Sequence, residues 1–268
     1  MNRATLLAIV TLSTLQAQTT DATRPKFEVA SIKPTKEQGA MYGVGNGDAS
    51  EHAVTVKMLI GLAYRLQEFE IVGGPAWASA DRFNIEAKAA DPNADPNQLR
   101  LMLQSLLADR FNLKVHTETK QNSVYLLEVA KNGPRIKLSA DQTSPDVSGP
   151  SAPGAGPNHG AFRFGPGAMT GNAVTLSLFT RFLSQRMDRT ILDKTGLTGR
   201  YDIQLSWQPG EGENPLDPGG NRVQPAGPDP SRSSIFVAIE EQLGLKMQSA
   251  KAPIDLLRID SLEHLSEN

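Results

Sequence analysis

The feature that most constrains the fold is a pattern of apolar positions that occurs twice. Val54-Thr55-Val56 opens a patterned segment in the first half of the chain, and Val174-Thr175-Leu176 opens one in the second half. In both segments apolar residues recur at about i, i+1, i+4 and i+5; they are Met58, Leu59, Leu62, Ala63 and Leu66 in the first and Leu178, Phe179, Phe182, Leu183 and Met187 in the second. This spacing predicts an amphipathic helix with one buried stripe in each half.

The two halves continue in the same order after this helix. A short apolar pair follows in each, Ile71-Val72 and Ile191-Leu192, and a turn-rich link comes next. Residues 83–89 and 201–207 then alternate strictly between apolar and polar, which predicts a strand with one buried side and one side facing water. An arginine directly precedes each strand, Arg82 in one half and Arg200 in the other.

A second helix and closing strands complete each half. We predict helices over residues 99–111, started by the Pro96-Asn97 cap, and over residues 234–243, ended by Gly244. Two short strands follow each helix; they are predicted at 113–117 with 124–129, and at 245–249 with 254–259. Opening strands are expected within residues 27–33 and 162–174. The matched order and spacing indicate an internal duplication.

These elements predict an α+β fold. Strands with one face buried and one face exposed to water favour antiparallel or mixed sheets with helices packed on one face. We expect two tandem copies of a β-α-β-β-α-β-β-like unit. We expect a first repeat at 18–140 and a second at 168–268. Residues 141–167, rich in Pro and Gly, form the linker between them, and residues 209–231 form a long loop in the second copy.

The first residues have the composition of a secretory signal peptide. Arg3 precedes a short apolar run from Ala4 to Leu12, and Ala17 is a small residue at the expected cleavage site. We therefore expect a signal peptide over residues 1–17 and an exported protein, periplasmic or extracellular after cleavage. No other stretch reaches about 18 consecutive apolar residues, so the mature chain should have no transmembrane segment.

Composition excludes several classes of function. The chain has no cysteine, which rules out disulfides, thiolate metal sites and a cysteine nucleophile. Its formal net charge is −2, whereas a nucleic-acid-binding surface is basic, so no nucleic-acid partner is expected.

No motif nominates a catalytic or metal site. The four histidines, His52, His116, His159 and His264, do not lie at metal-ligand spacing, and neither a Gly-x-Ser-x-Gly turn nor a Ser-x-x-Lys motif occurs. We expect no catalytic residue, no metal and no cofactor. The aromatic residues Tyr64, near the end of the first helix, and Trp77, in a Gly-Gly-Pro turn, are the candidates for binding a ligand or partner, although packing beneath the turn explains Trp77 equally well.

Five segments carry a resemblance to a known family. They are Phe27–Pro34, Gly73–Trp77, Leu107–Phe111, Asp193–Asp202 and Ser266–Asn268. On these residues the chain resembles the soil-associated family of uncharacterised exported proteins expanded in Acidobacteria. The family has no established activity to carry over; related segments fused to membrane receptor peptidases of the antibiotic-sensing type imply an extracytoplasmic sensing or binding role.

Three functions stay open from the sequence. The favoured one is an extracytoplasmic binding or interaction module, with sensing as one such role, whose partner is an envelope protein, a peptide or a glycan. The alternative is a secreted hydrolase whose carboxylates converge only in the fold. The third is a purely structural envelope protein.

Overall fold

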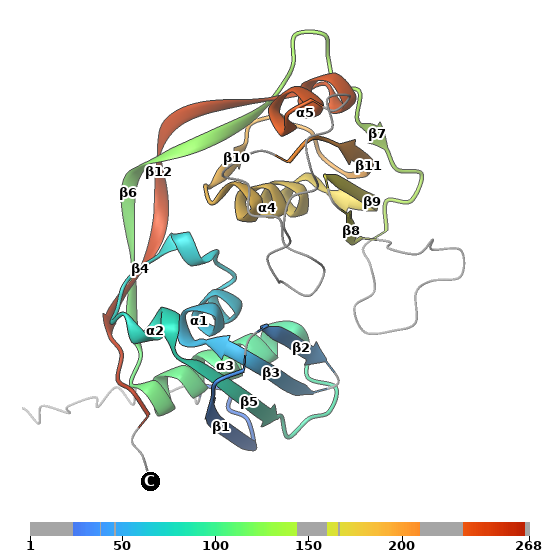
Figure 1. Ribbon diagram of the computed structural model, residues 1–268. Helices are drawn as coiled ribbons and strands as arrows, with labels where there is room; N and C mark the ends of the chain where they lie inside the picture. The colour runs from blue at the N-terminus through green and yellow to red at the C-terminus, as the bar shows by residue number, and fades with distance from the viewer. Residues whose placement is uncertain are drawn as a thin grey trace, which may run out of the picture.

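The protein consists of two lobes at the two ends of a long, curved β-ribbon, and both lobes lie on the same side of the ribbon (Figure 1). The computed structural model describes residues 24–37, 39–45, 47–143, 160–165, 167–209 and 233–265. The predicted signal peptide, residues 144–159 of the linker and residues 210–231 of the long loop lie outside the described residues.

The first lobe contains an antiparallel sheet in the order β1-β5-β3-β2. Its strands are β1 (Val29–Thr35), β2 (Met41–Gly45), β3 (Asp48–Thr55) and β5 (Arg82–Lys88). Its helices are α1 (Val56–Tyr64), the short α2 (Trp77–Ala80) and α3 (Pro96–Phe111), with a 3-10 turn, η1, at Glu68–Glu70. The helices pack between this sheet and one end of the ribbon (Figure 1).

The second lobe contains an antiparallel sheet in the order β7-β11-β9-β8. Its strands are β7 (Lys137–Leu138), β8 (Phe162–Gly165), β9 (Ala168–Thr175) and β11 (Arg200–Ser206), and its helices are α4 (Leu176–Met187) and α5 (Ile235–Leu243). Both helices again lie between the lobe sheet and the ribbon, and Trp207 is fully buried in this core.

The ribbon is formed by β6 (Lys114–Val129) and β12 (Leu245–Ser261), which pair antiparallel over almost their full length. Two short strands, β4 (Ile71–Gly73) and β10 (Ile191–Asp193), pair parallel with β12 and β6 at opposite ends. Each predicted pair of short closing strands is therefore one continuous strand. The residues between them do not form a turn, because their backbones continue the pairing of β6 with β12 across the ribbon.

The ribbon exchanges strands between the halves of the chain. β6 begins in the first lobe and ends in the second, where Leu127 is buried in the core. β12 runs the opposite way and returns Leu257 and Ile259 to the core of the first lobe. Gln121 pairs with Pro253 near the middle, and the pairings on either side of it are related by an approximate two-fold axis. Each lobe core thus contains residues from both halves.

The corresponding helices α1 and α4 begin with the same kind of N-cap. The hydroxyl of Thr55 accepts a hydrogen bond from the N–H of Met58 at the start of α1, and Thr175 does the same for Leu178 at the start of α4.

Gly244 ends α5 in the left-handed conformation, at φ 64°, and a Cβ there would lie 2.4 Å from the carbonyl oxygen of Gly133. Glycine is therefore required at this helix end.

The predicted α+β class is confirmed, with antiparallel and mixed sheets and helices on one face of each lobe sheet. The predicted helices and the strands at 83–89 and 201–207 occur within a few residues of their expected bounds. The cap of α3 lies one residue earlier than predicted, at Asp95, whose carboxylate accepts from the N–H groups of Asn97 and Gln98; Pro96 is the first helical residue.

Candidate functional site

A cleft with a volume of about 490 Å³ lies between the two lobes, and residues of both lobes line it. The first lobe contributes Arg65, Gln67 and Glu70, and the second contributes mainly hydroxyl-bearing and basic residues: Gly160, Thr175, Ser177, Leu178, Thr180, Arg181, Ser184, Thr190, Ile191 and Arg200. We refer to this space as the interlobe cleft. Its volume lies in the range of small-molecule sites.

The local fold aims two arginines into the cleft from opposite lobes. Arg65 is the C-terminal cap of α1 and has a left-handed backbone at φ 60°, so it leaves the helix axis where the chain turns. Arg181 lies in the middle of α4. Both side chains are accessible to solvent. Arg200 differs, because its Nη1 donates to the carbonyl oxygen of Ala173 at 2.9 Å and supports β9.

The arginines repel one another electrostatically. Desolvation, followed by the charge of Arg65, holds the pKa of Arg181 below its usual value, while Glu70 acts in the opposite direction. Arg100, on α3, has its pKa lowered by desolvation and then by the charges of Arg65 and Arg181. Arg181 is exposed to solvent, so this repulsion is partly screened. The cleft therefore gathers positive charge that the surrounding protein does not fully neutralise.

The nearest acid is already engaged. One carboxylate oxygen of Glu70, Oε2, accepts a hydrogen bond from the N–H of Gln67 at 2.9 Å. The other, Oε1, accepts from the hydroxyl of Thr190 in the second lobe at 3.2 Å. Within the described part of the chain, neither Arg65 nor Arg181 has an ion pair or hydrogen-bonded carboxylate. Chemically, the cleft offers cationic and hydroxyl donors to a ligand.

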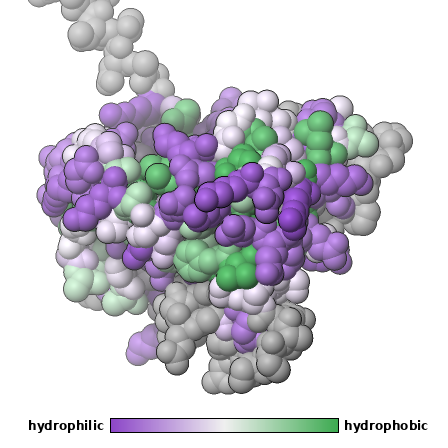
Figure 2. Space-filling view, turned by 90° about the horizontal axis from the view of Figure 1, so that it is seen from above, coloured by the Kyte–Doolittle hydropathy of each residue, from purple (hydrophilic) through white to green (hydrophobic). Residues whose placement is uncertain are grey.

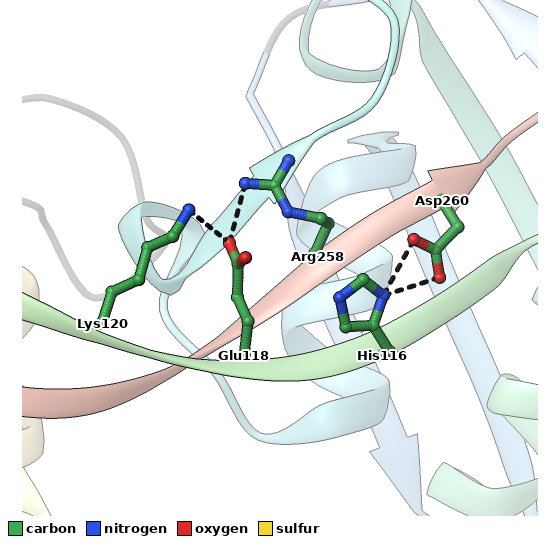
Figure 3. Close-up of polar contacts among 5 residues, drawn as sticks. All are labelled: His116, Glu118, Lys120, Arg258 and Asp260. Atoms are coloured by element: carbon green, nitrogen blue, oxygen red, sulfur yellow. Dashed lines mark hydrogen bonds and ion pairs between the residues drawn. The ribbon is translucent and has the colours of Figure 1, made fainter.

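A second polar group lies on the exposed surface of the ribbon (Figure 3). His116 Nδ1 lies 2.8 and 2.9 Å from the two carboxylate oxygens of Asp260. Glu118 Oε1 forms ion pairs with Arg258 at 2.8 Å and with Lys120 at 2.9 Å, and these hydrogen bonds lower the pKa of Glu118 to about 2. About half of the His116 side chain is exposed, and the pair lines none of the described cavities. These contacts form a polar surface and do not make a pocket.

One buried acid stands apart from the cavities. Glu51, on β3, is fully buried, and neither carboxylate oxygen has a hydrogen-bond partner. Burial raises its pKa from 4.5 to about 8, so its neutral form dominates at pH 7. Glu51 lines none of the cavities described for the chain.

The structure does not bring the two predicted binding residues together in one cavity. Tyr64 lines a separate pocket of about 420 Å³ beside α3, with Arg24 and Lys114. Trp77 is half-buried at the edge of the first core, where its ring stacks on Phe111 at 6.3 Å and meets His264 edge-on at 4.7 Å. Packing contacts therefore account for much of the Trp77 surface, and binding by either residue stays a prediction.

Sequence reasoning did not find Arg65 and Arg181. No sequence spacing identifies these two arginines as partners, because they are far apart in the chain. They line one cleft only because the strand exchange of the ribbon places the two lobes side by side. The one available signal was a basic residue on each of two corresponding helical segments, and many surface helices carry such residues.

Among the described residues, no group of three or more His, Asp and Glu side chains could hold a metal ion. The same part of the chain has no helix that is long and apolar enough to cross a membrane. On the face seen from above, hydrophilic residues cover most of the described surface and apolar residues form small separate patches (Figure 2).

Comparison with known proteins places the chain in a family. No curated protein and no solved structure matches it. Residues 57–262 match a family described as a protein of unknown function, DUF3738. The match covers both long ribbon strands and leaves out β1, β2, β3 and the first residue of α1. The expected membership of an uncharacterised family is confirmed, whereas export and the association with soil bacteria and Acidobacteria stay predictions. The chain belongs to the DUF3738 family of proteins of unknown function.

Proposed function

We propose that this protein is an exported, non-catalytic binding module that holds a ligand in the interlobe cleft. The observation that carries the proposal is that two lobes of matching element order face each other across a cavity of about 490 Å³ lined with polar side chains from both. Binding sites commonly form at the junction of two structural units, where both can contribute contacts. Export itself rests on the composition of residues 1–17.

The contents of the cleft favour binding over hydrolysis. Glycoside hydrolysis by paired acids needs two carboxyl groups facing one space. Among the described residues, one carboxyl group, that of Glu70, lines the interlobe cleft, and both of its oxygens already accept hydrogen bonds. The acid with a strongly raised pKa, Glu51, lines none of the described cavities. A secreted hydrolase is therefore the less favoured alternative.

Tyr64 and Trp77 remain proposed as a secondary contact surface for an envelope partner. Tyr64 has a pocket beside it, and Trp77 keeps part of its ring accessible. Aromatic residues with one packed side and one exposed side are common anchors in interfaces.

A thermal-shift experiment on residues 18–268 tests the main proposal with three probe classes found in cell envelopes. These are short peptides, neutral oligosaccharides and disaccharide-peptides of the cell-wall type. Binding to the folded protein alone raises the melting temperature with ligand concentration. We expect at least one class to do so, and Ser177→Trp, which fills the cleft, to abolish the shift.

The matched control is Ser123→Trp, at an exposed position on the ribbon outside the cleft, which should leave the shift unchanged. The proposal is wrong if no probe class raises the melting temperature, or if the shift survives in Ser177→Trp. Mass spectrometry of the same mixtures provides a second readout. Cleavage of any probe would favour the hydrolase.

A further inference from the structure

We propose that the ligand of the interlobe cleft is an organic anion whose carboxylate or phosphate group binds between Arg65 of the first lobe and Arg181 of the second. This inference rests on the proposed function and specifies its ligand. Its basis is the arrangement of charge: two guanidinium groups from opposite lobes line one cavity, and neither forms an ion pair with a carboxylate within the described part of the chain.

The chemistry of arginine fits this role. A guanidinium group presents several N–H donors in a fixed plane, which match the two oxygens of a carboxylate or phosphate. Like charges held close together with too little opposite charge nearby destabilise a protein, and an anion between them offsets that repulsion. The interlobe cleft therefore has an electrostatic reason to bind an anion.

The neighbouring acids do not take this place. Glu70 is held by the N–H of Gln67 and the hydroxyl of Thr190. Asp95, the acid beside Arg100, caps α3 by accepting from two backbone N–H groups. Arg100 itself donates to the side-chain oxygen of Asn97 at 2.9 Å and does not line the cavity, but its charge interacts with those of Arg65 and Arg181.

The size and remaining surface of the cleft indicate more than a bare inorganic ion. A cavity of about 490 Å³ is several times larger than a phosphate ion, whose volume is on the order of that of a few water molecules. The hydroxyl groups of Ser177 and Thr180 line the same wall of α4. The Thr180 hydroxyl donates to the carbonyl oxygen of Ser177 at 3.1 Å, whereas Ser177 is exposed. The Ser177 hydroxyl can hydrogen-bond to polar groups on the rest of the ligand, such as sugar hydroxyls or peptide groups.

Isothermal titration calorimetry at low salt tests the inference with matched probes. Glucose 6-phosphate is compared with glucose, and a tripeptide with a free C-terminal carboxylate is compared with its C-terminal amide. We expect the anionic member of at least one pair to bind at least ~10-fold more tightly than its neutral counterpart, because a charge-assisted hydrogen bond contributes more than a neutral one. The two pairs distinguish a phosphate ligand from a carboxylate ligand.

Variants then locate the site. Arg181→Gln should weaken anion binding by ~10-fold or more, and Arg65→Gln/Arg181→Gln should abolish it. Arg163→Gln, at an exposed position on β8 outside the cleft, removes the same charge and should leave binding unchanged. Because losing Arg181 relieves repulsion, the variant should melt at the same or a higher temperature than the wild type, which separates lost binding from lost folding.

The outcomes separate the two proposals. Anion binding that is weakened by ~10-fold or more in Arg181→Gln and kept in Arg163→Gln supports the inference. Equal binding by both variants, or no anionic probe binding at millimolar concentration, overturns it. If a neutral probe binds and Ser177→Trp blocks it, the cleft is a binding site but not one for anions, so the proposed function stands and the inference fails.

Discussion

The side-chain oxygen of Asn84 accepts a hydrogen bond from the backbone N–H of Ala53 at 2.8 Å. Ala53 has a left-handed backbone at φ 52°, where the pairing of β3 with β5 is interrupted by a bulge. Arg82 donates to the carbonyl oxygen of the same residue. Two side chains of β5 thus satisfy the backbone that the bulge leaves unpaired, which is the condition for keeping it buried.

Replacing Asn84 should therefore destabilise the fold. Asn84→Ala leaves the N–H of buried Ala53 without a partner, and we expect the free energy of unfolding to fall by about 1–3 kcal/mol. Urea unfolding followed by circular dichroism measures this change.

The second lobe supplies the matched control. Asp202 accepts from the N–H of Ala173 at 3.1 Å in the equivalent bulge, where Ala173 has φ 51° and Arg200 donates to its carbonyl oxygen. Asn84→Asp should therefore keep most of the stability that Asn84→Ala loses. Equal losses in the two variants would show that the hydrogen bond is not what supports the bulge.

The buried acid Glu51 predicts a pH dependence of stability. Its pKa is about 8 in the folded protein, compared with 4.5 for a solvated glutamate. The folded state therefore binds more protons between these values, so stability falls as the pH rises from about 5 to about 9. For a shift of this size the loss is up to roughly 5 kcal/mol, an upper bound because local rearrangement reduces it.

The variant Glu51→Gln isolates this effect. It should unfold like the wild type near pH 5, where both side chains are neutral, and should be the more stable protein near pH 9. Glu86→Gln, at an exposed position on the neighbouring strand, is the control and should follow the wild type at both values. Chemical denaturation at each pH provides the measurement; parallel curves for wild type and Glu51→Gln would refute a titrating Glu51.

Sequence patterns predicted the local elements well because those elements are determined locally. The paired apolar positions around Leu59 and Phe179 form buried helical stripes, and the alternation from Phe83 to Ala89 places every second side chain in the core. A threonine cap and a terminal glycine such as Gly244 act within one helical turn.

The patterns could not predict how the halves combine. Leu127 and Leu257 are apolar residues on strands with one exposed face. The residues next to them in the sequence do not indicate that each leucine packs in the lobe formed mainly by the other half. The candidate site depends on that exchange, because it brings Arg65 and Arg181 to one cleft. The positive charge of the cleft could not be predicted either, because the placement of charges that bind a ligand follows no sequence period.

Trp77 gives a prediction that separates packing from partner binding. Its ring contacts Phe111 and His264, so Trp77→Ala should lower the free energy of unfolding by about 2–4 kcal/mol. Tyr64→Phe removes a hydroxyl that no described residue hydrogen-bonds, so it should change stability by less than about 0.5 kcal/mol. Thermal and urea unfolding of both variants make the comparison. An unchanged stability for Trp77→Ala would leave its ring free to serve as a partner anchor.

The strand exchange leads to a prediction about the separate halves. Residues 24–143 alone lack β12, which supplies Leu257 and Ile259 to the core of the first lobe, and residues 160–265 alone lack β6, which supplies Leu127 to the second. Each isolated half should therefore fail to fold as a monomer, because its apolar core would be open on one side. The approximate two-fold relation of the ribbon also lets two copies of one half pair their long strands with each other, so a half that does fold should do so as a dimer.

Mixing the halves should restore the native arrangement, since β6 and β12 then pair as they do in the intact chain. We expect a one-to-one complex with the circular dichroism spectrum of the full chain, detected by size-exclusion chromatography with light scattering. Leu257→Asp in the second half is the control, because a charge in the core of the first lobe should prevent this complex. A stably folded monomer of either half would mean that the lobe does not depend on the exchanged strand.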